Sequence, residues 1–177
     1  NIELKNALGR ASEDPLLLAR VLSRPDASPY DTLLVDVGEH NGVVSGMHVL
    51  SDGDLLIGEV VRVWKESALV QLYSAPGSSV PVEIGASSTP AVAHGSGGGM
   101  FRITVPKGMS ISVGSSVRFP DLSPLYVGVV EGVLRSEESS FQTLFVRLPI
   151  GLFDGKFVYV RVPVEPAPVL FATTTPA

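Results

Sequence analysis

The pattern closest to a catalytic motif is a serine within a run of glycines, His94-Gly95-Ser96-Gly97-Gly98-Gly99. A serine in such a turn can act as a nucleophile when neighbouring backbone N–H groups form an oxyanion hole. It also needs a histidine as general base and an aspartate to orient that histidine. Because Ser96 lies midway along the chain and no aspartate precedes it directly, a flexible glycine-rich linker is the favoured interpretation. The partners that a triad could draw on are His40 and His48 with Asp36, Asp52 or Asp54.

Metal and cofactor chemistry finds little support among the remaining residues. The chain has no cysteine, which excludes disulfides, thiolate metal sites and cysteine nucleophiles, and its three histidines are scattered. Asp52, Asp54 and Glu59 offer carboxylates, but Ser51-Asp52-Gly53-Asp54 contains the Asp-Gly dipeptide of a tight hairpin turn. An apolar stretch rather than a helix follows the glycine run, so a phosphate cradle is not formed. We therefore assign no catalytic residue, no metal site and no cofactor.

The composition favours a turn-rich β protein and excludes several classes of function. The 177 residues carry a formal net charge of −5, which argues against binding to nucleic acid. An apolar fraction of 45% against 18% charged residues is too hydrophobic for a disordered chain. Eighteen glycines and 14 prolines indicate many short elements. The first residue is Asn1 rather than Met, so we expect a piece of a longer protein, and no apolar run reaches the length of a membrane span.

The elements that would position any site are predicted to be short strands. Ile2, Leu4, Leu8 and Ala11 have near-helical spacing before Pro15, which predicts a short helix, the end of a coiled coil. No convincing helix follows. Apolar and polar residues then alternate in short runs about ten residues apart, separated by glycine or proline, which is typical of small barrels or a sandwich. The expected strands cover residues 17–22, 32–37, 58–64, 69–73, 101–105, 125–133, 143–148 and 157–162.

An internal repeat predicts that the β unit is duplicated. Residues 45–49 form a glycine-led turn into a strand and precede the glycine-entered strand 57–63, while residues 113–117 and 127–133 repeat the same pattern. A further strand follows each copy, with Val70-Gln71-Leu72 in one and Val146-Arg147-Leu148 in the other. A small barrel needs glycine where a strand bends or a turn takes positive φ. The stretch 85–99 between the copies is expected to be a linker or a loop.

One loop carries an unusual concentration of apolar side chains. The segment Phe119-Pro120-Asp121-Leu122-Ser123-Pro124-Leu125-Tyr126 has two prolines, which disfavour a strand, and four large apolar residues. These side chains either cap the end of a barrel or form an exposed patch for a protein partner. On the second interpretation the partner-binding residues are Phe119, Leu122, Leu125 and Tyr126.

The order of the glycine and valine motifs resembles the MreC family of bacterial rod shape-determining proteins. The resemblance spans about residues 1–162 and is strongest over residues 19–82. The sequence departs from the family pattern at Ser116 and across residues 118–124. The matching segments are 19–22, 31–38, 41–43, 46–49, 53–63, 78–82, 95–99, 105–106 and 113–114, with residues 3–8 similar to the end of the family's coiled coil.

The resemblance implies a membrane-anchored protein whose bulk lies outside the cytoplasmic membrane. Its family architecture is a transmembrane helix and a coiled coil, followed by two small β-barrels arranged as in chymotrypsin-like proteases but without the triad. The implied role is a scaffold that associates with copies of itself and with the class B penicillin-binding transpeptidase of cell elongation. The family also works with the MreB, MreD and RodA proteins. No nucleic acid is implied, and membrane contact runs only through a segment absent from this chain.

Together these observations predict a mainly β protein with two small six-stranded barrels in tandem and a short N-terminal helical stub. We expect the stub at 1–15, the first barrel at 16–85, the second at 86–165 and a proline- and threonine-rich tail at 166–177, with late strands able to pack back on the first barrel. The predicted function is a non-enzymatic periplasmic scaffold of the cell-elongation machinery that self-associates through exposed edge strands. The alternatives are a small trypsin-like serine hydrolase using Ser96 and a glycan-binding β module.

Overall fold

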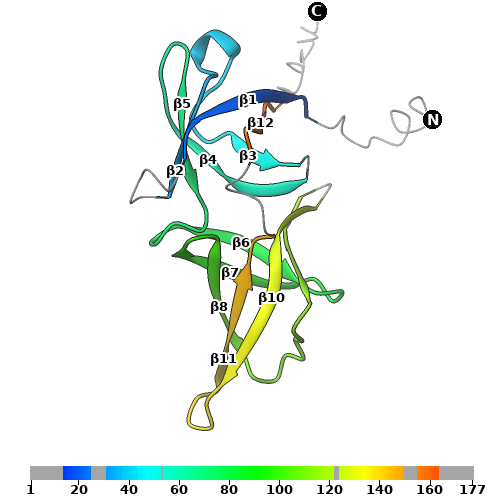
Figure 1. The fold of residues 1–177 in the computed structure, drawn as a ribbon. Coiled ribbons are helices and arrows are strands. Elements are labelled where there is room, and N and C mark those ends of the chain that lie inside the picture. Colours follow the sequence, from blue (N-terminus) through cyan, green and yellow to red (C-terminus); the bar gives the residue numbers. More distant parts are fainter. Residues whose placement is uncertain (1–13, 25–30, 53, 122–123, 150–154, 164–177) are drawn as a thin grey trace, which may run out of the picture.

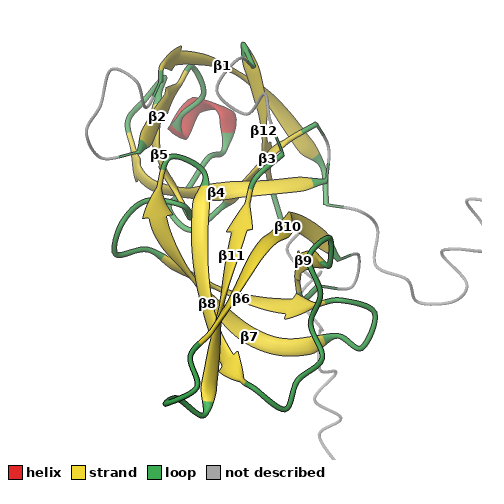
Figure 2. Cartoon of the chain, turned by 60° about the horizontal axis from the view of Figure 1, so that its bottom comes forward, coloured by secondary structure: helices red, strands yellow, loops and turns green. Residues whose placement is uncertain are grey.

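A computed structural model describes residues 14–24, 31–52, 54–121, 124–149 and 155–163. The predicted helical stub and the tail therefore lie almost wholly outside the described residues. Within them, no helix is long and apolar enough to cross a membrane, and the one helical element is a short 3-10 turn, Glu39–Asn41 (red in Figure 2). The strands are β1 (Leu16–Ser23), β2 (Thr32–Val35), β3 (His48–Ser51), β4 (Leu55–Val63), β5 (Ala68–Leu72), β6 (Ser79–Ile84), β7 (Thr89–Gly97), β8 (Met100–Pro106), β9 (Ser116–Phe119), β10 (Leu125–Arg135), β11 (Phe141–Arg147) and β12 (Phe157–Arg161).

These strands form two closed barrels of six strands each, one above the other in Figure 1. In the first barrel the order is β4-β3-β12-β1-β2-β5, and pairing of β5 with β4 closes the ring. In the second the order is β11-β8-β7-β6-β9-β10, and pairing of β10 with β11 closes it. Every pairing within a barrel is antiparallel. The prediction of a mainly β fold with two six-stranded barrels is confirmed.

Alternation of apolar and polar residues explains why these segments form barrel strands. In β8 the side chains of Phe101, Ile103 and Val105 are buried, whereas the residues between them are exposed. A strand points successive side chains to opposite faces, so a period of two places one face in the barrel interior. Burying each such side chain stabilises the fold by about 1.5–3 kcal/mol.

Hydrogen bonding supports the duplicated β unit that the sequence suggested. The N–H of Gly46 donates to the carbonyl oxygen of Val60 at 2.7 Å, and the N–H of Gly114 donates to that of Val130 at 2.8 Å. Both glycines have positive φ, 92° and 90°, a conformation that other residues rarely adopt. In each barrel the same turn therefore leads into a short strand, β3 or β9, and is bonded to the long strand beside it, β4 or β10.

A second pair of glycines allows the barrels to close. In β4, a Cβ on Gly58 would meet the backbone of Gln71, and in β10 a Cβ on Gly128 would lie 2.6 Å from the carbonyl oxygen of Arg147. Each glycine precedes a shift in register, a β-bulge that bends its strand. The glycines thus permit neighbouring strands to approach closely where the sheet curves.

The path of the chain differs from the sequence-based picture in one segment. The stretch 85–99, expected as a linker or loop, instead contains β7, which pairs with β6 and β8. Strand β6 belongs to the ring of the second barrel, and β12 returns to the first barrel between β1 and β3. Which parts fold independently is not given by strand pairing, so the domain ranges 16–85 and 86–165 remain a prediction.

Candidate functional site at the joint between the barrels

The predicted partner-binding segment lies where the two barrels meet, and it divides into buried and exposed parts. Leu125 is only 7% exposed and belongs to the hydrophobic core, whereas Tyr126, the next residue of β10, is 46% exposed. Phe119, at the end of β9, is half-buried. Leu122 lies outside the described residues. Of the predicted contact residues that the structure describes, Tyr126 is therefore the one that offers most of its surface to a partner.

Backbone pairing connects the two barrels at Tyr126. Strand β10 of the second barrel bridges β4 of the first in parallel, with Tyr126 opposite Leu55. The N–H of Tyr126 donates to the carbonyl oxygen of Asp54 at 2.9 Å. Residues 55–58 are all buried, which means that both faces of β4 are covered here. The backbone at Tyr126 is thus held against the first barrel.

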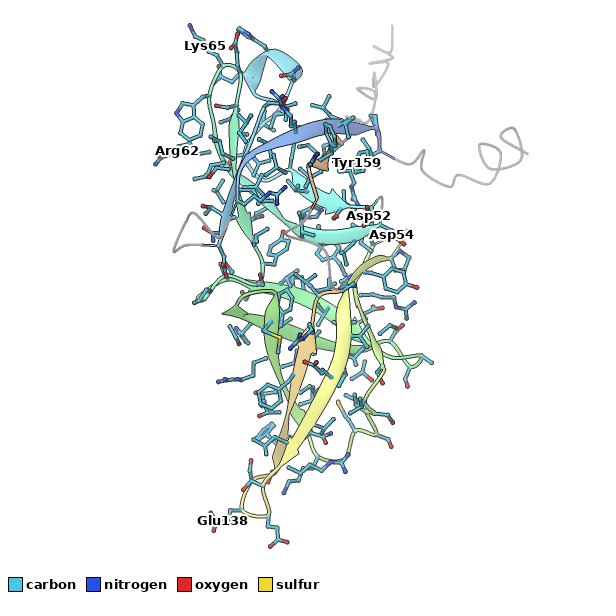
Figure 3. All side chains as sticks on the ribbon, viewed as in Figure 1. Asp52, Asp54, Arg62, Lys65, Glu138 and Tyr159 are labelled. Atoms are coloured by element: carbon cyan, nitrogen blue, oxygen red, sulfur yellow. The ribbon has the colours of Figure 1, made fainter. Side chains whose placement is uncertain are left out.

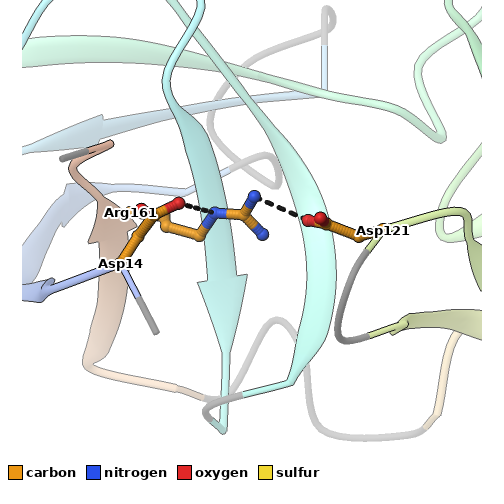
Figure 4. Close-up of polar contacts among 3 residues, drawn as sticks. All are labelled: Asp14, Asp121 and Arg161. Carbon is orange, nitrogen blue, oxygen red and sulfur yellow. Dashed lines mark hydrogen bonds and ion pairs between the residues drawn. The ribbon is translucent and has the colours of Figure 1, made fainter. Parts of the chain in front are cut away.

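An arginine bridges the barrels beside this strand contact. The Nε of Arg161 in β12 lies 3.1 Å from a carboxylate oxygen of Asp14, and its Nη2 lies 2.6 Å from Asp121 (Figure 4). Asp14 precedes β1 of the first barrel, while Asp121 follows β9 of the second. The Arg161 side chain is 21% exposed, so water screens these pairs only in part. The planar guanidinium holds two carboxylates at once, one from each barrel.

A histidine completes the contacts between the two barrels. We call these contacts the joint, which consists of His48, Asp54 and Arg161 of the first barrel and Phe119, Asp121 and Tyr126 of the second. The rings of His48 and Phe119 lie edge to face, with centroids 5.0 Å apart. Burial and the positive charge of Arg161 lower the pKa of His48, against the opposing effects of Glu59 and Asp121.

A tyrosine and a glutamate lie next to the histidine in the first barrel. Glu59 is opposite His48 in the β3–β4 register, and its carboxylate accepts a hydrogen bond of 3.4 Å from the Tyr73 hydroxyl. Burial, with the nearby Glu59 charge, raises the pKa of Tyr73. The hydroxyl therefore stays protonated and acts as a donor, which fixes the Glu59 carboxylate beside the joint.

The glycine run forms a second contact between the barrels rather than a nucleophile loop. Gly95 packs so closely on the backbone of Ser74 that a Cβ would lie 2.6 Å from its carbonyl carbon. The N–H of Gly97 donates to the carbonyl oxygen of Ser74 at 2.7 Å, and that of Gly98 donates to the Asp31 carboxylate at 3.1 Å. These N–H groups are the donors that an oxyanion hole would need, and the first barrel already uses them.

The candidate triad residues are not brought together. Ser96 is exposed on β7, and within the described part of the chain its side chain makes no hydrogen bond to a histidine or an aspartate. Asp36 instead pairs with Arg20 of the neighbouring strand, at 3.4 Å. The described residues also contain no group of three histidine or acidic side chains able to hold a metal ion. In the described residues the serine, histidine and aspartate therefore do not form the hydrogen-bonded arrangement that the hydrolase hypothesis requires.

Sequence reasoning missed the residues that build the joint. Arg161 was placed only as a member of an alternating strand, and it pairs with Asp121, 40 residues away. Asp14 and Asp121 were ordinary polar residues of a predicted helix end and a loop. No spacing in the sequence joins these three positions. One local signal was present in the sequence: four apolar or small residues in a row at 55–58 interrupt the alternation of a barrel strand. Such a run indicates a strand that is buried on both faces, as residues 55–58 are.

Comparison with known families gives one match over most of the chain. The sequence model described as "Rod shape-determining protein MreC, barrel core" matches residues 21–162. No curated protein matches the chain in sequence.

Solved structures share the fold at low sequence identity. The crystal structure of MreC from Pseudomonas aeruginosa is similar with a TM-score of 0.76 and 23% identity, over 84% of this chain and all of that one. A major periplasmic domain of the cell shape-determining filament MreC gives 0.66 and 21%, over 85% of this chain and 96% of that one. The MreC–PBP2 complex from Helicobacter pylori contains a chain that matches with 0.62 and 12%, over 84% of this chain and 99% of its own length.

Proposed function

The chain belongs to the MreC family of rod shape-determining proteins, and from this premise we propose that it is a non-enzymatic scaffold of the bacterial cell-elongation machinery. The proposed location is the periplasm, or the extracytoplasmic space, with anchoring to the inner membrane through a segment outside this chain. The similar structure of a periplasmic MreC domain supports this location. The family resemblance also supports cooperation with the MreB, MreD and RodA proteins.

The proposal rests on the joint, which holds one barrel against the other and leaves Tyr126 exposed. A scaffold that positions an enzyme needs a rigid surface, and the β4–β10 bridge and the Arg161 pairs supply rigidity. Tyrosine is enriched in protein interfaces because its large ring is amphipathic and loses little entropy on binding. The proposed partner is the class B penicillin-binding transpeptidase of elongation, as supported by the Helicobacter pylori MreC–PBP2 complex.

The structure refines how the partner-binding residues are proposed to act. Tyr126 contacts the transpeptidase directly. Phe119 and Leu125 are more buried and act indirectly, by packing at the joint and so holding Tyr126 in place. Leu122 remains a proposed contact. A charge at Leu125 is a poor test of this surface, since it would be buried in the core and unfold the barrel whether or not a partner binds there.

Calorimetry with the extracytoplasmic domain of the same organism's transpeptidase tests this proposal. Replacing Tyr126 by aspartate is expected to weaken binding at least about tenfold, the loss of about 1.4 kcal/mol typical of an interface aromatic. Phe141→Asp is the matched control, since Phe141 is 53% exposed at the start of β11, far from the joint. Equal affinities for Tyr126→Asp and the unmodified chain, with both folded, would remove this surface from the proposal.

Self-association is proposed through a face of the first barrel rather than through strand edges. Within the described residues each strand has a neighbour on both sides over at least part of its length, which leaves few free strand edges, so the edge-strand mechanism suggested by the sequence stays a prediction. The outer face of β1 and β12 exposes Leu16, Leu18, Leu22 and Phe157 at 42–53%. The register places Leu18 beside Tyr159 and Arg20 beside Phe157, so these side chains share one face.

Sedimentation equilibrium can test this second surface. Leu18→Asp places a charge at the centre of the apolar face and is expected to shift any dimer towards monomer. Val92→Asp is the matched control because Val92 is comparably exposed, 47%, on the second barrel. An unchanged dimer in Leu18→Asp would assign self-association to another part of the molecule.

A further inference from the structure

The joint contains a titratable side chain that the scaffold role does not require. His48 projects from β3 of the first barrel, is half-buried, and contacts the ring of Phe119 of the second barrel. The other two histidines, His40 and His94, are exposed on the surface. His48 is thus the histidine placed where a change of charge acts on the contact between the barrels.

Charged groups from several elements surround this histidine. Arg161 approaches from β12 and is held by Asp14 from the start of β1 and by Asp121 from the loop after β9. Glu59 faces His48 from β4 and is bound by the hydroxyl of Tyr73. Asp121 and Glu59 attract a proton to His48, but burial and the Arg161 charge outweigh them, so its pKa lies below the ordinary 6.5.

A proton on His48 is therefore more costly when the joint is closed than when it is open. In the closed joint the imidazolium loses water and lies near the Arg161 guanidinium. Separation of His48 from the Phe119 ring returns both to water and removes part of that cost. Whatever favours one protonation state in one conformation shifts the conformational equilibrium when the pH changes.

We propose that the joint, closed and rigid while His48 is neutral, is a pH-responsive hinge, in which protonation of His48 loosens the contact with Phe119 and lets the two barrels change their relative orientation. The hinge converts acidification outside the cytoplasmic membrane into a different presentation of the Tyr126 surface. This inference goes beyond the proposed function and is tested on the isolated chain, so its failure is separate from a failure of transpeptidase binding.

The distance between the far ends of the barrels reports the hinge. The chain has no cysteine, so Lys65→Cys and Glu138→Cys introduce unique label sites, at the exposed tips of the first and second barrel (Figure 3). Single-molecule energy transfer is then measured at pH 8 and pH 5. We expect one distance population at pH 8 and a second population that appears at pH 5. Between the two pH values, the ratio of open to closed molecules should rise by at most about tenfold for each pH unit by which the closed joint lowers the pKa of His48.

Two variants assign the response to the histidine. His48→Phe keeps an aromatic ring against Phe119 but carries no proton, and is expected to abolish the second population at pH 5. His94→Gln removes an exposed histidine on β7 and is expected to leave the response intact. Circular dichroism at pH 8 checks folding, and His48→Gln replaces His48→Phe if that variant does not fold. An unchanged distance in the parent protein, or a full response in the His48 variant, overturns the hinge.

Discussion

The close approach of β10 and β11 makes opposite predictions for two glycines of one strand. A Cβ on Gly128 would lie 2.6 Å from the Arg147 carbonyl oxygen and 2.8 Å from a Val146 methyl, whereas ordinary contacts begin at 3.4 Å. A Cβ on Gly132 would meet nothing nearer than the Phe145 ring at 3.8 Å. Gly128→Ala must therefore push β11 outward by about 0.8 Å at the point of barrel closure.

The expected magnitudes follow from these distances. Overpacking costs about 1–3 kcal/mol, and each backbone hydrogen bond weakened beside it costs about 0.5–1.5 kcal/mol, so Gly128→Ala should lose about 2–4 kcal/mol of unfolding free energy. Small domains have about 5–15 kcal/mol in total, so the loss is easily measured. Gly132→Ala should be neutral or stabilise by up to about 1 kcal/mol, because alanine loses less backbone entropy than glycine in a strand.

Equilibrium unfolding in urea measures both variants with two probes. Far-ultraviolet circular dichroism reports all strands, while the single tryptophan, Trp64, reports the first barrel alone. If the barrels unfold together, Gly128→Ala shifts both signals to lower urea. If they unfold separately, only part of the dichroism transition shifts and the fluorescence transition stays in place, which also tests the domain ranges. Equal destabilisation by Gly128→Ala and Gly132→Ala would refute the steric reasoning.

Three further predictions concern the contacts between the barrels. Arg161→Met should lower the unfolding free energy by about 1–3 kcal/mol in urea, since it removes the guanidinium that pairs with two partly buried carboxylates, and added salt should reduce the difference. Asp31→Ala should lower the unfolding free energy by about 1–2 kcal/mol, because it removes the carboxylate that accepts the Gly98 N–H and places alanine at a positive φ of 47°. Asp31→Asn should cost little, because asparagine keeps an acceptor and tolerates that φ. Because the pKa of His48 is lowered, the stability that its neutral form contributes is fully present above pH 6.5 and is lost as the pH falls below that value. His48→Gln should flatten this decline in melts between pH 8 and 5.

Local pattern predicted most of the strands, and the failures have a physical explanation. Alternation in β8, β11 and β12 is strong because each has one face in a barrel and the other in water. Strands β6 and β7 were missed, since Pro81 and Pro90 lack an N–H for the sheet and the glycine and serine content of residues 85–99 resembles a loop. Tertiary packing overrides these weak preferences, because both strands are held by neighbours on each side.

The candidate site was predicted as a segment but not as a structure. Phe119 and Tyr126 were singled out because large apolar side chains in a proline-containing loop are unusual. That Leu125 is core and Tyr126 is exposed depends on how β10 meets β4, which alternation in one strand cannot give.

The sequence by itself determined most of the barrel strands, the glycine turns of the repeated unit and the absence of cysteine chemistry, because these depend on residue type and on spacing within about ten positions. Only the tertiary structure decided which strands pair, that β12 returns to the first barrel, and that Arg161 meets Asp121. Strand pairing and ion pairs between distant residues arise from the shared packing of the whole chain. No periodic pattern in the sequence indicates which distant residues will pair, so these pairs are known only from the structure in which both barrels are closed and joined.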